Sequence, residues 1–76
     1  MSFLLEVYVQ SSQLESALET LAILPFEVNP NLRPGAERTA IEFFAAEADH
    51  AQVVQNALTG AGLREPKVNV YEVALI

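Results

Sequence analysis

The chain repeats one arrangement twice, a stretch with strand periodicity followed by a stretch with helix periodicity. In residues 3–9 every odd position is apolar, whereas the even positions include Glu6 and Tyr8. Residues 39–45 show the same alternation, with Glu42 on the mixed parity. Because successive side chains of a strand point to opposite faces, each segment is predicted to be a strand with one buried face and one mixed face.

A helix is predicted after each of these strands. The first starts at a Ser12-x-x-Glu15 capping box and ends before Pro25. The second starts near Asp49 and is closed by Gly60 and Gly62. Apolar residues recur at helical spacing in both, namely Leu14, Ala17, Leu18, Leu21 and Ala22, then Val53, Val54, Ala57, Leu58 and Ala61.

Two further strands complete the order. Residues 26–28 are predicted to be a short second strand, followed by a connecting loop at 29–35. Residues 67–75 are predicted to be the last strand, which has apolar residues on both parities and therefore either bulges near Tyr71 or is covered on both faces. The resulting βαββαβ order predicts one α+β domain spanning residues 1–76. Its fold is a ferredoxin-like split βαβ, with a four-stranded antiparallel sheet in the strand order 4-1-3-2 and two helices on one face.

The length of the chain favours assembly. A lone domain of 76 residues buries only about 60% of its unfolded surface, and this chain has no cysteine to form a disulfide. The sequence ends on the apolar residues Ala74, Leu75 and Ile76, and an apolar terminal strand is more stable when paired or covered. We therefore expect a homo-oligomer, a dimer or a trimer.

The charge of the chain limits its partners. A formal net charge of −6 with four basic residues disfavours nucleic acid and anionic membrane surfaces. No segment resembles a signal peptide, and no apolar run approaches the roughly 20 residues that span a bilayer. The cytoplasm is the expected location.

The scarce cations are predicted to gather at one end of the fold. In the split βαβ topology, the turn after the first strand, the 29–35 loop and the segment before Lys67 meet at the same end. The residues expected there are Ser11, Ser12, Arg33, Arg38, Arg64 and Lys67. The two serines precede a helix N-terminus, where free N–H groups favour anions. This end is therefore a candidate site for a nucleotide, a phosphate or a carboxylate such as an amino acid. Alternatively, charged residues simply collect in loops.

The sheet face opposite the helices is a candidate interface. It is predicted to carry Leu4, Glu6, Tyr8, Ala40, Glu42 and Phe44, with Tyr71 on the last strand as a further interface residue. This surface is too apolar for plain solvent exposure, so we interpret it as an assembly face. A half-exposed sheet surface and a carboxylate metal cluster of Glu6, Glu42 and Glu72 are the alternatives, and no metal site is predicted.

Catalysis is not expected. His50 is the only histidine, at the start of the second helix, where it can pair with Glu47 or Asp49. No glycine-rich phosphate loop is present, because the three glycines are Gly35, Gly60 and Gly62. The chain is therefore predicted to be a non-enzymatic domain without a cofactor.

The C-terminal half of the chain resembles two families of regulatory domains. The segments from Ile41 to Gly62 and from Lys67 to Val73 are similar to the second half of the nitrogen-regulatory PII family. That resemblance implies phosphate contacts by Thr59, Gly60, Gly62 and Lys67. The same region is similar to ACT domains, in which a helix ends at a glycine and an alternating strand follows, and which bind amino acids at oligomer interfaces.

Two functions follow from these observations. The first is an oligomeric sensor of the PII-like or ACT-like type that binds a small anion at the cationic loop end. The second is an assembly or adaptor module that acts through the open sheet face. Both resemblances rest on fold-level pattern.

Overall fold

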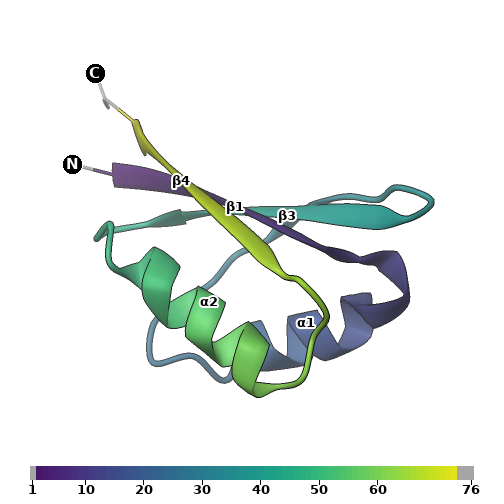
Figure 1. The fold of residues 1–76 in the computed structure, drawn as a ribbon. Helices are drawn as coiled ribbons and strands as arrows, with labels where there is room; N and C mark the ends of the chain where they lie inside the picture. The colour runs from purple at the N-terminus through teal and green to yellow at the C-terminus, as the bar shows by residue number, and fades with distance from the viewer. Residues whose placement is uncertain (1, 74–76) are drawn as a thin grey trace.

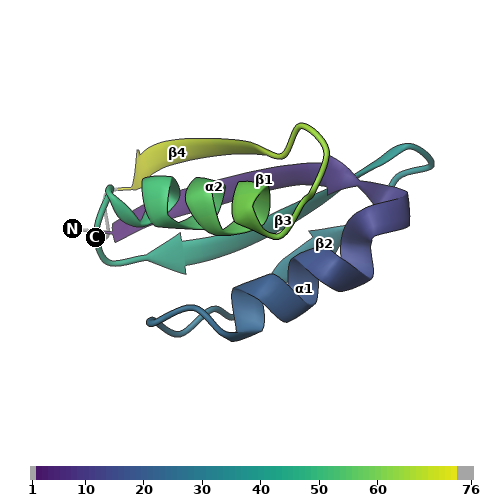
Figure 2. The ribbon, with the colours of Figure 1, turned by 60° about the horizontal axis from the view of Figure 1, so that its bottom comes forward.

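The computed structural model describes residues 2–73, and the predicted apolar ending at 74–76 lies outside the described residues. The elements follow the predicted order. They are β1 (Ser2–Gln10), the 3-10 turn η1 (Ser11–Gln13), α1 (Leu14–Ala22), β2 (Asn31–Arg33), β3 (Arg38–Ala45), α2 (His50–Gly60) and β4 (Lys67–Val73). The four strands form one antiparallel sheet in the order β2-β3-β1-β4. Both helices lie on the same face of it (Figures 1 and 2). The predicted α+β class, strand order and layer arrangement are confirmed.

The core lies between the sheet and the two helices. The odd residues of β1 and β3 face it, and Val7 of β1 lies directly opposite Ile41 of β3. Both of these side chains are fully buried. The helices contribute Ala17 and Leu21 from α1 and Val54 and Leu58 from α2. The parity that was predicted to be apolar is therefore the buried one.

The predicted position of the second strand is wrong. Residues 26–28 are irregular, and β2 lies at Asn31–Arg33, inside the predicted loop. Phe26 and Val28 are apolar because they pack against the core cluster from the helix side, where the Phe26 ring stacks on His50 at 4.0 Å. Pro30 and Pro34 bracket β2. Because proline lacks the N–H that a strand donates, they keep β2 short.

The helix starts also differ from the prediction. Ser12 lies inside η1, and α1 begins at Leu14 with Gln13 at the N-cap, so the predicted capping box does not start α1. The second helix starts at His50 with Asp49 at the N-cap, as predicted. No side-chain hydrogen bond caps either helix within the described residues.

The last strand pairs one-to-one with β1 from Lys67 opposite Tyr8 to Val73 opposite Ser2, so the alternative of a bulge near Tyr71 is wrong. Val68 packs against the core, whereas Tyr71 lies opposite Leu4 on the open face. Glu72 lies opposite Phe3, on the other parity, so it does not join Glu6 and Glu42 in a carboxylate cluster. None of the described helices is long and apolar enough to cross a membrane.

Candidate functional site

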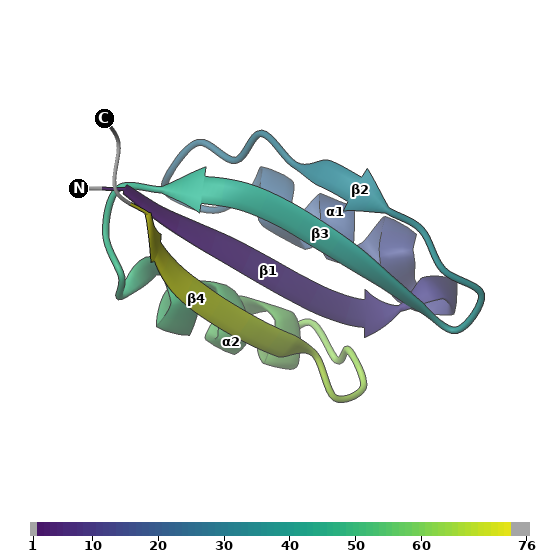
Figure 3. The ribbon, with the colours of Figure 1, turned by 90° about the horizontal axis from the view of Figure 1, so that it is seen from above.

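Three connections meet at one end of the sheet. Figure 3 shows the β1–α1 turn, the β2–β3 loop and the α2–β4 loop together at the right-hand end of the view. This juxtaposition follows from the split βαβ topology, which the strand order confirms. The scarce cations are nevertheless not all gathered there.

A shallow depression of about 620 Å³ opens on the sheet at this end, lined by Tyr8, Arg38, Glu65, Pro66, Lys67 and Asn69. The middle strand β1 supplies Tyr8, which lies directly opposite Lys67 of β4. The first residue of β3, Arg38, lies opposite Gln10 of β1. The depression therefore has β1 as its floor and one cationic side chain on each flanking strand.

The two cations of the depression differ in their partners. Arg38 Nη2 lies 3.8 Å from Glu65 Oε2, and both side chains are largely exposed. Lys67 forms no ion pair with the residues that the structure describes. Exposed ion pairs contribute little to stability, so the Arg38 guanidinium is held only loosely.

Ser11 has a structural role rather than a position facing the depression. Its hydroxyl donates to the Gly35 carbonyl at 2.7 Å and lies 2.8 Å from Thr39 Oγ1. The Ser11 N–H donates to the Glu37 carbonyl at 2.8 Å. These bonds tie the β2–β3 loop to the end of β1. Ser12 lines a neighbouring shallow hollow of about 450 Å³ that also includes Arg38.

Arg33 lies on the open sheet face instead of the loop end. Its guanidinium bridges two carboxylates, with Nη2 2.9 Å from Glu6 Oε2 and Nε 2.8 Å from Glu42 Oε1. The Tyr71 hydroxyl donates to the other Glu6 oxygen at 3.4 Å. These contacts cross from β2 over β3 to β1, and we name the Arg33–Glu6–Glu42 group the clasp.

Hydrogen bonding sets the protonation of this part of the sheet. The Tyr8 hydroxyl, and after it the Asn69 amide and the Arg33 guanidinium, hold the pKa of Glu6 below its ordinary 4.5, although desolvation opposes them. In return, the hydrogen bond to Glu6 raises the pKa of Tyr8 above 10.0. Glu6 is therefore a carboxylate at neutral pH.

The remaining predicted ligand residues do not line the depression. The Arg64 backbone N–H donates to Gln13 Oε1 at 3.0 Å, and its side chain is exposed. Thr59 and Gly60 form the last turn of α2, and Thr59 accepts a 3.4 Å hydrogen bond from Gln55. Gly62 has a φ of +85°, a left-handed conformation that closes the helix. Phosphate contacts by Thr59, Gly60 and Gly62 stay a prediction from the PII resemblance.

Sequence reasoning missed four of the six lining residues, namely Tyr8, Glu65, Pro66 and Asn69. It assigned Tyr8 to the interface only, and it did not single out the other three for the ligand site. The available signal was the pairing of β1 with β4, which places Tyr8 beside Lys67 and Asn69 on one face. The sequence left open whether the last strand bulges near Tyr71, so it could not establish which of its residues lie opposite Tyr8.

The predicted interface residues lie together on the open face. Leu4 lies opposite Phe44 on one side and Tyr71 on the other, which makes an apolar row across three strands. Phe44 is 62% exposed and Tyr71 is 49% exposed. The row therefore presents aromatic surface to the solvent beside the clasp.

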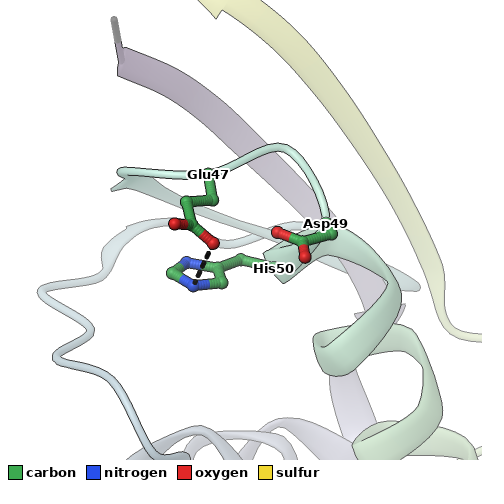
Figure 4. A group of neighbouring side chains, drawn as sticks. All are labelled: Glu47, Asp49 and His50. Carbon is green, nitrogen blue, oxygen red and sulfur yellow. Dashed lines mark ion pairs between the residues drawn. The ribbon is translucent and has the colours of Figure 1, made fainter.

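A second group of chemistry-bearing residues lies at the start of α2 (Figure 4). Glu47, Asp49 and His50 could offer one nitrogen and two oxygens to a metal ion, from atoms that lie within 4.8 Å of one another. His50 Nε2 lies 4.0 Å from Glu47 Oε2. The positive end of the α2 dipole disfavours a cation here, and the ring stacks flat on Phe26 with an interplanar angle of 5°. We therefore interpret His50 as a packing residue.

No protein-family model and no curated protein matches the chain. Among solved structures, the chain is similar to a DUF3240 family protein from Shewanella baltica OS155, whose crystal structure has a resolution of 2.40 Å. The TM-score is 0.70, with 14% sequence identity, and the match covers 99% of this chain and 92% of that chain. At this identity the likeness shows the fold alone. It supports the ferredoxin-like βαββαβ arrangement and does not distinguish a PII-like from an ACT-like domain.

Proposed function

We propose that the chain is a non-enzymatic regulatory domain of the PII-like or ACT-like type that binds a small anion in the depression between Arg38 and Lys67. The observation that carries this proposal is the pairing of two of only four basic side chains of an acidic chain in one depression. Asn69 adds an amide with a second N–H that can hydrogen-bond to a bound oxyanion, whereas the single O–H of Tyr8 is already donated to Glu6.

The composition of the depression favours binding over catalysis. A hydrolytic nucleophile needs an adjacent base, and the single histidine of the chain does not line the depression. The lining instead combines two cations and one carboxylate, that of Glu65, with the rings of Tyr8 and Pro66. Such a surface suits an anion with an apolar portion, and it leaves nucleotides and amino acids as the candidate ligands beside phosphate.

A thermal-shift screen against ATP, ADP, AMP, phosphate, pyrophosphate and the amino acids tests the proposal. Ligand that binds the native state raises the melting temperature by mass action, by an amount that grows with concentration. We expect a selective and saturable rise with at least one of these anions at fixed ionic strength. A melting temperature that is unchanged by all of them would contradict anion sensing.

The exposed row of Leu4, Phe44 and Tyr71 favours a second function, assembly through the open sheet face. Aromatic side chains that remain exposed on a small domain are typical of protein interfaces. This function is compatible with the first, because the row and the depression occupy different parts of the same face.

A further inference from the structure

The ion pair between Glu65 and Arg38 spans the mouth of the depression. Glu65 precedes β4 by two residues, whereas Arg38 begins β3, and β1 lies between these two strands. Neighbouring strands are about 4.8 Å apart, so β3 and β4 are separated by about 10 Å. Because the Arg38 guanidinium and the Glu65 carboxylate lie 3.8 Å apart, the two side chains must meet over β1.

The backbone at Glu65 is unusual. Its φ is +47°, a left-handed conformation that is uncommon for residues other than glycine. Burial does not hold it there, because the Glu65 side chain is 85% exposed. Pro66 follows directly and restricts the chain as it enters β4. Strained residues of this kind tend to occur at ligand sites, where the surrounding fold holds them.

We propose that the Glu65 carboxylate is an internal competitor of the ligand: it occupies the place beside Arg38 that the anionic group of the ligand takes on binding. This inference rests on the proposed function of the depression. In the empty site the carboxylate partly neutralises Arg38, and a bound anion displaces it into solvent. Because the pair is exposed and 3.8 Å long, the displacement costs little and the competition is mild.

Three variants separate the charge of Glu65 from its reach. Glu65→Gln removes the charge and keeps the length of the side chain. Glu65→Asp keeps the net charge of −6 but is one methylene shorter, so that its carboxylate withdraws from Arg38. Glu72→Gln is the matched control, because it removes one negative charge from β4 on the other side of the sheet.

The probe is pyrophosphate, titrated by calorimetry at fixed ionic strength. We expect Glu65→Gln and Glu65→Asp each to bind it about two- to fivefold more tightly than the wild type, with Glu72→Gln close to wild type. Equal affinity in the wild type and both Glu65 variants would overturn the inference. The inference would also be overturned if Glu65→Gln and Glu72→Gln gained the same affinity for pyrophosphate and Glu65→Asp gained none. The change in net charge would then explain the gain.

The two proposals fail in different ways. If the wild type binds pyrophosphate and Arg38→Ala weakens binding, while the Glu65 variants change nothing, only the competitor role is wrong. If neither the wild type nor any Glu65 variant binds pyrophosphate, the competitor role is overturned, whereas the proposed function fails only if every anion of the thermal-shift screen also leaves the melting temperature unchanged. Because Glu65 is exposed, we expect its variants to keep the wild-type melting temperature. Measuring that temperature is the control that the variants are folded.

Discussion

At the scale of single residues, Glu6 is the most highly connected charge of the sheet. Its two oxygens receive the Arg33 guanidinium and the Tyr71 hydroxyl, and its side chain is only 14% exposed although it lies on the open face. Its pKa is lowered chiefly by the Tyr8 hydroxyl. A lowered pKa means that the folded state prefers the ionised carboxylate.

This preference makes the stability contribution of Glu6 depend on pH. The folded-state pKa of Glu6 lies below 4.5. The ionised carboxylate therefore contributes fully to the free energy of unfolding above pH 4.5, and this contribution is lost as the pH falls through the folded-state pKa. We expect Glu6→Gln to be less stable than the wild type at neutral pH, with the difference closing on acidification. Urea unfolding at several pH values measures it. Glu19→Gln, on the exposed side of α1, is the control. A difference that is constant across the acid range would show that ionisation of Glu6 does not matter.

At the scale of elements, β2 is the strand with the least support from packing. All three of its residues are exposed, and it pairs with β3 only. The clasp compensates, because the Arg33 side chain of β2 reaches Glu42 on β3 and Glu6 on β1. Thus β2 is held to the sheet by side chains as much as by its short ladder.

Removal of the Arg33 guanidinium should therefore loosen β2 most. In Arg33→Ala we expect the β2 amides to exchange with deuterium about two- to fivefold faster, and more so than those of β1 and β3, where Glu6 and Glu42 are left facing each other without their shared cation. Arg64→Ala removes the same charge from an exposed position outside the sheet and should leave β2 unchanged. Equal exchange rates of the β2 amides in the wild type and Arg33→Ala would show that the backbone hydrogen bonds to β3 hold β2 without the clasp.

The elements also show how far the sequence could predict the fold and the site. Alternation and helical spacing identify β1, β3, α1 and α2, because each buries one face. No such pattern marks β2, whose residues are all exposed. Phe26 and Val28 have the alternation of a strand, but they lie in an irregular segment that packs against the core. The topology predicts that Arg38 and Lys67 lie at one end. The position of Arg33 depends on the true location of β2, and the position of Glu65 depends on loop geometry, so neither could be read from spacing.

At the scale of the whole molecule, the helices cover one sheet face and leave the other open (Figures 1 and 3). A domain of this length buries only about 60% of its unfolded surface, so that association through the open face would add a second buried layer. The apolar row of Leu4, Phe44 and Tyr71 is the most apolar part of that face and the natural centre of such a contact.

Charge placed in the row should prevent assembly. We expect the wild type to be a dimer or a trimer in solution and Phe44→Lys to be a folded monomer, because an ammonium group cannot be buried there without a partner. Light scattering coupled to gel filtration gives the mass. Ile23→Lys changes an apolar side chain that is 84% exposed after α1, off the sheet face, and should keep the wild-type mass. Phe44→Lys with the wild-type mass would exclude the row from the interface.

Anion binding between Arg38 and Lys67 is tested most directly by comparing the affinity of the wild type for pyrophosphate with that of three single-cation variants at fixed ionic strength. Arg38→Ala and Lys67→Ala should each weaken binding about tenfold or more, because each removes a charge-assisted hydrogen bond. Arg64→Ala removes the same charge outside the depression and should stay within about twofold, since solvent screens exposed charges at a distance. Equal losses in all three variants, or no loss in Arg38→Ala and Lys67→Ala, would contradict a ligand site in this depression.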